Sequence, residues 1–207
     1  MRQQLTTRRL LGLDRSGGPP PETRRDQPLH PWTLPNAIGF LRIGLIPVFL
    51  ILALGSGDGR DTTATVLFAF VAASDYLDGM VARITGQYSR LGALLDPLTD
   101  RLLVISGAIV AWDFELLPRW ALLVLALREA FMLLLTQIAL RRRLDIGVNM
   151  LGRWAVWPTM AALGLAMIVE TWLSDALLYV GLALTLAATA RYLQDGRRAL
   201  AQGSTST

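Results

Sequence analysis

The sequence predicts an all-α integral membrane protein with six transmembrane helices and both termini in the cytoplasm. Of its 207 residues, 53% are hydrophobic, which is too apolar for an ordinary soluble domain. Apolar segments recur along the chain, and each is near the ~20 residues needed to cross a bilayer. Arginine content alternates between the intervening loops, which orients the segments. We expect these segments at 36–54, 62–84, 92–112, 119–140, 153–171 and 175–194.

The two ends of the chain differ from its apolar middle. Residues 1–30 are polar and rich in Arg, Gly and Pro, which predicts a disordered cytoplasmic tail. No apolar stretch follows the early arginines within signal-peptide distance, so no cleaved targeting segment is expected. Residues 31–196 should form one six-helix membrane domain, and residues 197–207 a polar C-terminal tail.

Orientation follows from the arginines. They gather in the N-terminal tail, in the 83–90 turn, between 141 and 153, and at the C-terminal end, whereas the loops near 58–61, 113–119 and 170–175 hold few. By the positive-inside rule, the termini and the 83–90 turn are cytoplasmic. The formal net charge is +4, but the arginines flank apolar helices, so an anionic lipid surface is the expected partner and nucleic acid is not. Without cysteine, disulfide and thiolate chemistry are excluded.

The stretch 75–100 carries the chemistry, because it places four carboxylates between apolar runs. On insertion scales each costs about 2.5–3.5 kcal/mol at a helix centre. Asp75 and Asp78 share one helix face, and Asp96 and Asp100 share a face of the next helix. In a hairpin of the two helices the carboxylates would converge and repel one another unless a divalent cation were bound. Hard oxygen ligands suit magnesium, calcium or manganese better than zinc.

Glycine, alanine and arginine complete this pattern at fixed spacings. The stretch resembles the signature of the CDP-alcohol phosphotransferases, which has the pattern D-x2-D-G-x2-A-R-x8-G-x3-D-x3-D. These are membrane enzymes that move phosphoalcohol groups from a CDP-linked donor. The alternative is the carboxylate cluster of a non-enzymatic ion or lipid transporter, which leaves the glycine and arginine positions unexplained. The matching residues are Asp75, Asp78, Gly79, Ala82, Arg83, Gly92, Asp96 and Asp100.

The resemblance implies a metal-dependent transfer from CDP-diacylglycerol. Asp75, Asp78, Asp96 and Asp100 would hold two Mg2+ ions, with Mn2+ as an alternative, and Asp100 would also take the proton of the acceptor hydroxyl. Phosphoryl transfer needs mainly charge neutralisation and alignment of the reactants. Nothing resembles an activated Ser, Cys or His nucleophile, so we expect a single displacement that releases CMP.

The resemblance also implies contacts to the donor nucleotide. Gly39 stands where relatives often carry threonine, so a hydroxyl contact is missing. For Asn36 the alternative is a helix cap, and for Ser89 it is a solvated turn. Arg42 interrupts an apolar run and is expected to face the bundle interior. The donor-binding set is Asn36, Gly39, Gly79, Ala82, Arg83, Ser89 and Gly92.

Two further features concern helix geometry. Pro97 would lie either in a first helical turn or at a bend. Arg128 and Glu129 fall in the middle of the fourth segment. Adjacent residues do not face one another on a helix, so each is expected to find its own partner elsewhere. A structural polar link between helices is the favoured role for them.

The flanking sequence bears on the acceptor and looks like the glycerol-acceptor branch of the family. Arg153 opens the fifth segment, where a helix N-terminus favours anions, and Arg191 is a second acceptor candidate. Phosphatidylglycerophosphate synthases usually show Gly-Gly-Lys-x-Lys-Thr here, but residues 151–156 lack the second basic residue and the threonine. We therefore favour phosphatidylglycerol as acceptor, as in cardiolipin synthases, over glycerol 3-phosphate.

Assembly and location follow from the same resemblance. It implies a homodimer, and the small residues between Gly181 and Ala190 would permit close helix approach. We expect a multi-pass protein of the cell membrane with its active site facing the cytoplasm.

Overall fold

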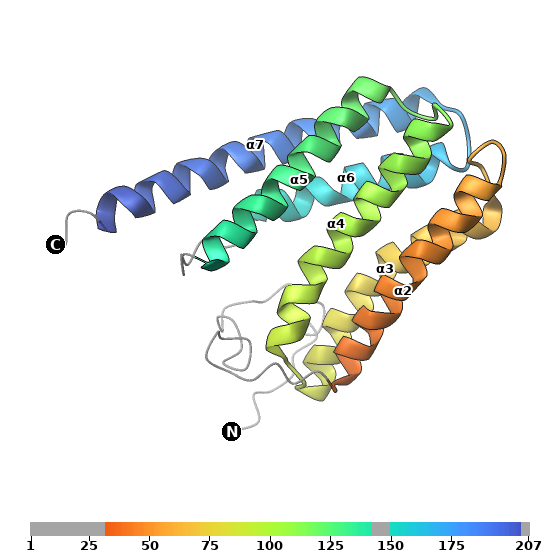
Figure 1. Cartoon of the computed structure of the whole chain (residues 1–207). Helices are drawn as coiled ribbons and strands as arrows, with labels where there is room; N and C mark the ends of the chain where they lie inside the picture. Colours follow the sequence, from red (N-terminus) through yellow and green to blue (C-terminus); the bar gives the residue numbers. More distant parts are fainter. Residues whose placement is uncertain (1–31, 142–149, 204–207) are drawn as a thin grey trace. The chain divides into compact units, whose positions relative to one another are not determined.

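The structure is a computed structural model, and it describes residues 32–141 and 150–203. Within these ranges the chain forms helices and no strands, which confirms the all-α prediction for the described part. The predicted tail at 1–30 lies outside the described residues. The helices are α2 (Leu34–Gly55), α3 (Thr62–Thr85), α4 (Arg90–Asp113), α5 (Arg119–Arg141), α6 (Met150–Ala166) and α7 (Trp172–Gly203) (Figure 1).

The helices follow the apolar segments closely except at the end of the chain. Helix α6 ends at Ala166, before the predicted end at 171, whereas α7 continues beyond 194 to Gly203. The helix therefore includes most of the stretch that the sequence assigned to a polar tail. Apolar length determines where a segment can cross a bilayer, but it does not end a helix.

Among the described residues, three helical stretches are long and apolar enough to cross a membrane, namely Leu34–Gly55, Thr62–Ala82 and Trp172–Gln194. Helix α4 falls short because its first half contains Asp96, Asp100 and Arg101. The six predicted crossings and the positions of the termini therefore remain predictions.

Large apolar side chains cover much of the helix surface. Ile51, Val66, Leu127, Leu134 and Ile168 are all exposed, although each lies in or beside an apolar helix. A soluble monomer rarely exposes so much apolar surface. In a bilayer these side chains face lipid, while the helical backbone satisfies its own hydrogen bonds. The chain is therefore a membrane protein.

The chain divides into two compact units. The first comprises the described residues up to Leu52 together with Thr63–Leu103, and so contains most of α2, most of α3 and the first half of α4. Its apolar core includes the rings of Phe49 and Phe68, whose centroids lie 5.3 Å apart. All the residues of the aspartate signature belong to this unit.

The second unit comprises Ala53–Thr62 and the chain from Val104 onward. Helix α7 packs along α6 and also contacts α5 (Figure 1). The two helices approach closely at Gly181, where an added Cβ would lie 2.3 Å from Thr159 Oγ1 and 2.9 Å from the Thr159 backbone nitrogen. Gly181 thus contacts α6 of its own chain, whereas Ala183 and Ala187 are exposed. The predicted homodimer remains a prediction.

Candidate functional site

The turn between α3 and α4 joins the N-termini of α2 and α4. Gly86 follows the end of α3 with φ of 67°, a left-handed conformation in which glycine commonly ends helices. Ser89 then caps α4, because the backbone N–H of Gly92 donates to Ser89 Oγ at 2.9 Å. The Leu34 N–H, at the start of α2, donates to Gln87 Oε1 at 3.1 Å. One short turn therefore satisfies end groups of two helices.

Asn36 connects this turn to α2. The Ser89 hydroxyl donates to Asn36 Oδ1 at 2.8 Å, and both side chains are buried. The helix-cap alternative for Asn36 is wrong, because its own N–H donates to Thr33 Oγ1 at 3.3 Å, which makes Thr33 the cap of α2. The solvated-turn alternative for Ser89 is also wrong, since the hydroxyl is buried and bonded on both sides.

Two glycines of the predicted donor set differ in how tightly they are packed. A Cβ at Gly92 would lie 2.8 Å from Asn36 Oδ1 and 3.1 Å from Ser89 Oγ, so only glycine fits without moving these side chains. A Cβ at Gly39 would lie 3.8 Å from Leu95 Cδ1, an ordinary contact. Packing therefore requires glycine at position 92 and does not require it at position 39.

Arg42 brings two aspartates of the signature together from different helices. Its Nη1 donates to Asp75 Oδ1 on α3 at 3.0 Å, and its Nη2 donates to Asp100 Oδ1 on α4 at 2.9 Å. Its Nε donates to the carbonyl oxygen of Val71 at 3.2 Å. This confirms that Arg42 faces the interior. The sequence did not identify its partners, and its only signal was a charge within an apolar helix.

The carboxylates differ from the arginine in exposure. The Asp75 side chain is 43% exposed and that of Asp100 is 31% exposed, whereas Arg42 is 1% exposed. Both carboxylates can therefore meet a ligand, while the guanidinium lies beneath them. The positively charged Arg42 guanidinium bridges the Asp75 and Asp100 carboxylates. Carboxylate oxygens are hard donors, and such a donor set fits a divalent cation.

Of the other charged signature residues, the structure describes the side chain of Asp96. Asp96 is half-buried in α4 and makes a polar or ionic interaction. The side chains of Asp78 and Arg83 lie outside the described part of the structure. Among the described side chains, no group of three potential metal ligands lies close together. Asp78 follows Asp75 by about one turn of α3.

The remaining residues of the hairpin are backbone and packing positions. Ala82 is buried and Gly79 is half-buried, and both lie on α3. Pro97 lies well inside α4, which begins at Arg90, so the first-turn alternative is wrong. Because proline has no N–H, the carbonyl of residue 93 lacks its usual helical partner.

Helix α5, in the other unit, contains a second arginine whose side chain is largely enclosed, Arg128, with 10% exposed. The Arg128 guanidinium pairs with Glu129, and its Nε donates to Thr189 Oγ1 on α7 at 3.0 Å. The expectation that these neighbours would not pair is wrong, because long side chains can curl toward each other along a helix. The predicted polar link between helices is confirmed by the bond to Thr189.

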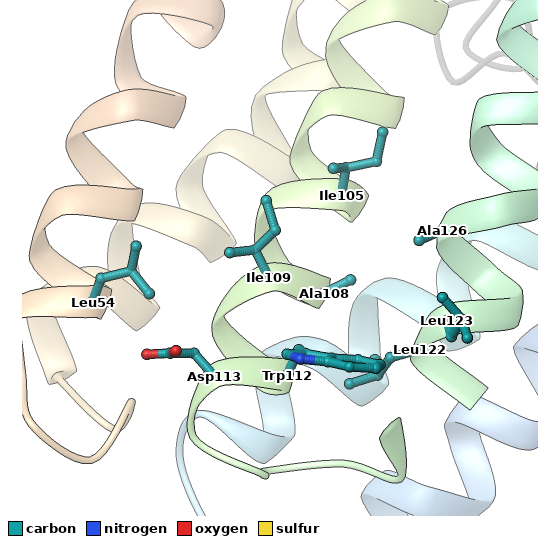
Figure 2. Close-up of a pocket in the computed structure, with 9 residues that line it drawn as sticks. All are labelled: Leu54, Ile105, Ala108, Ile109, Trp112, Asp113, Leu122, Leu123 and Ala126. Carbon is teal, nitrogen blue, oxygen red and sulfur yellow. The ribbon is translucent and has the colours of Figure 1, made fainter. Parts of the chain in front are cut away.

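The acceptor candidates also belong to the second unit. Arg191 is exposed on α7, and Arg153 lies in α6 with its side chain outside the described part. A cavity of about 470 Å³ in this unit contains neither of them (Figure 2). Its lining is apolar apart from Trp112 and Asp113, so it does not suit a nucleotide diphosphate.

Comparisons with known proteins agree with the signature. The family model described as CDP-alcohol phosphatidyltransferase matches residues 32–187, which include every predicted site residue except Arg191. The chain is 36% identical over 167 residues to the cardiolipin synthase (CMP-forming) of Streptomyces coelicolor, covering 78% of each chain.

Relatives with the other acceptor are also found. The chain is 32% identical over 143 residues to the CDP-diacylglycerol–glycerol-3-phosphate 3-phosphatidyltransferase of Bacillus subtilis, covering 63% of this chain and 74% of that protein. It is 28% identical over 138 residues to the enzyme of the same name from Cereibacter sphaeroides, covering 65% and 62%.

Proposed function

This chain belongs to the CDP-alcohol phosphatidyltransferase family, and we propose that it transfers a phosphatidyl group from CDP-diacylglycerol to phosphatidylglycerol. It is a phosphatidyltransferase of phospholipid biosynthesis. The observation that carries the choice of acceptor is the 36% identity to a CMP-forming cardiolipin synthase across 78% of both chains. Residues 151–156 support it, since they lack a second basic residue and a threonine that a small dianionic acceptor would use.

The proposed chemistry is a single displacement. Enzymes of this family generally use divalent metal ions. Two Mg2+ ions bound by Asp75, Asp78, Asp96 and Asp100 would offset the charge of the donor diphosphate. Asp100 accepts the proton of the acceptor hydroxyl. The hydroxyl oxygen bonds to the lipid-linked phosphorus while the bond to CMP breaks.

Donor and acceptor contacts complete this proposal. The forked guanidinium of Arg83 suits phosphate oxygens, and Arg153 and Arg191 are proposed to contact the acceptor. Asn36 and Ser89 favour binding of the donor diphosphate, because their hydrogen bond joins the N-termini of α2 and α4. Helix N-termini favour anions. The proposed nucleotide contacts are Asn36, Gly39, Gly79, Ala82, Arg83, Ser89 and Gly92.

An acceptor assay tests the function. Purified protein in detergent is given CDP-diacylglycerol and Mg2+, with either phosphatidylglycerol or glycerol 3-phosphate, and CMP release and lipid products are measured. We expect cardiolipin from phosphatidylglycerol. Use of glycerol 3-phosphate alone would make the chain a phosphatidylglycerophosphate synthase, an outcome that the Bacillus subtilis relative makes worth testing. No CMP release with either acceptor would favour a transporter.

The proposed topology has six crossings in the cell membrane, with both termini and the aspartates at the cytoplasmic face. The alternating arginine content of the loops supports it. A reporter fused after Thr207 should be cytoplasmic, and one inserted at Gly57 should be external. A cytoplasmic reporter at Gly57 would contradict this map.

The proposed assembly is a homodimer. Its support within the chain is the exposed alanines Ala183, Ala187 and Ala190 on α7, which recur at helical spacing and permit close approach. Cross-linking in native membranes should trap a dimer. Recovery of monomer alone, under conditions that cross-link a known dimer, would contradict the proposal.

A further inference from the structure

Arg42 lies outside the eight signature positions, yet it contacts the first and the last of the signature aspartates. Asp75 and Asp100 come from different helices, and the guanidinium of Arg42 on α2 is the group that they share. Asp75 and Asp100 each accept a hydrogen bond from Arg42 through Oδ1. The separation and the rotation of the two carboxylates are therefore set by one planar group.

The arginine is itself fixed by the backbone. Its Nε donates to the carbonyl oxygen of Val71, which also accepts from the Ser74 hydroxyl at 2.8 Å. Val71 lies one turn before Asp75 on α3. The Nε edge of the guanidinium is thus held by α3, and the opposite edge is directed at the two carboxylates.

Burial separates the arginine from any ligand. Arg42 is almost completely buried, whereas both of its carboxylate partners are partly exposed. A ligand that reaches the carboxylates from the exposed side therefore meets their oxygens and does not meet the guanidinium. Arg42 would therefore act on the reaction through the carboxylates that it holds, Asp75 and Asp100 among them.

We propose that Arg42 is a positioning residue, which holds the Asp75 and Asp100 carboxylates from beneath at the separation that a divalent cation and the acceptor hydroxyl require. This inference rests on the proposed function of the aspartate site. The positive charge of Arg42 also offsets the repulsion between the two carboxylates. The planar fork is the essential feature, because a lysine ammonium cannot reach three acceptors in the same geometry.

Arg42→Lys is the most informative variant, because it keeps the charge and loses the fork. Mn2+ binding is measured by electron paramagnetic resonance on purified protein in detergent, without donor or acceptor. We expect the Kd for Mn2+ to rise about 10–100-fold, the range typical of groups that orient metal ligands. In the CMP-release assay, kcat should fall by a similar factor, while KM for CDP-diacylglycerol should change less.

Arg42→Gln extends the test, since it removes both charge and fork, and it should weaken Mn2+ binding at least as much. Wild-type Mn2+ affinity and kcat in folded Arg42→Lys would overturn the proposal. Tighter Mn2+ binding by Arg42→Gln would also overturn it, because Arg42 would then act only as a competing charge.

Arg128→Lys is the matched control, because the Arg128 side chain is only 10% exposed and is also paired with a carboxylate, but in the other unit. It should lower thermal stability and leave Mn2+ affinity unchanged. Failure of the proposed function is separable, since it would appear as absence of CMP release by the wild type. The comparison of Mn2+ binding would still decide the role of Arg42.

Discussion

Two arginines whose side chains are largely enclosed, Arg42 and Arg128, show how one kind of interaction serves two purposes. Arg42 bonds to carboxylates on two other helices, and these carboxylates are 43% and 31% exposed. Arg128 bonds to Thr189 of α7 and to Glu129, whose side chain is only 7% exposed. Both arginines are satisfied, so pairing does not distinguish them. The exposure of the partners does, because only the partners of Arg42 can meet a ligand.

Energetics supports this distinction. Removing one member of a buried ion pair leaves an uncompensated charge, which is strongly destabilising, whereas an intact pair contributes little net stability. The pair in α5 therefore needs only to stay satisfied. At the Arg42 site, by contrast, the Asp75 and Asp100 carboxylates stay partly exposed, although they could have been buried as fully as Glu129 is. We infer that the first cluster is kept for chemistry and the second for packing.

The largest expected effect is on turnover. Asp100→Asn should lower kcat for CMP release about 10²–10⁴-fold, the range for loss of a general base. Glu129→Gln should leave kcat within about twofold of the wild type, on the argument that the Arg128–Glu129 pair serves packing. Binding of a CDP-linked donor, measured by its protection against thermal unfolding, should survive in Asp100→Asn. Wild-type kcat in Asp100→Asn would refute the base assignment.

The next effect is on stability, and here the larger change is expected at the Arg128–Glu129 pair instead of at the Arg42 cluster. Glu129→Ala should lower the free energy of unfolding by about 3–5 kcal/mol, because the Arg128 charge is left buried without its carboxylate. The double variant Arg128→Met/Glu129→Leu should recover most of this loss. Thermal unfolding in detergent measures both. A double variant as unstable as Glu129→Ala would show that the pair contributes more than mutual compensation.

A smaller effect separates two tightly packed glycines. Overpacking should cost about 1–3 kcal/mol in each alanine variant. Gly181→Ala should cost more, because its Cβ meets the Thr159 backbone, whereas at Gly92 the Cβ meets the Asn36 side chain, which can rotate. Only Gly92→Ala should raise KM for CDP-diacylglycerol, since it displaces Asn36. An unchanged KM in Gly92→Ala would contradict the donor role of Asn36.

Much of the fold was predictable because bilayer thickness constrains it. Apolar length located α2 to α5 within a few residues, and helical periodicity placed the signature aspartates on two faces. The extension of α7 to Gly203 was missed because the length of an apolar segment does not predict whether the helix continues into the polar residues that follow it. Helix boundaries outside the hydrocarbon region depend on local backbone contacts instead.

The site was predictable in its residue types and less so in its contacts. Spacing indicated that Asp75 and Asp100 would converge, but it did not show that Arg42 would bridge them, because that bond joins three helices. Asn36 and Thr33 are both short polar residues at the start of α2, and only the structure distinguishes the cap from the interhelical contact. Rules of helical spacing describe Cβ directions and do not limit where long side chains reach.

The smallest expected effect concerns Gly39, which has room for a larger side chain. Gly39→Ala should raise the free energy of unfolding by about 0.5–1 kcal/mol, because alanine loses less backbone entropy in a helix than glycine. The added methyl group would make an ordinary contact with Leu95. Gly44→Ala on the same helix is the control, since its Cβ would meet nothing within 4 Å.

These two variants test whether Gly39 belongs to the donor site. If the nucleotide approaches the backbone at Gly39, the alanine variant should bind CDP-diacylglycerol more weakly although the protein is more stable. Gly44→Ala should gain stability without any change in KM. Stability would then rise while donor affinity falls in Gly39→Ala, whereas in Gly44→Ala stability would rise and donor affinity would stay the same. Equal KM values in both variants would remove Gly39 from the donor site and leave Asn36 as the proposed contact on α2.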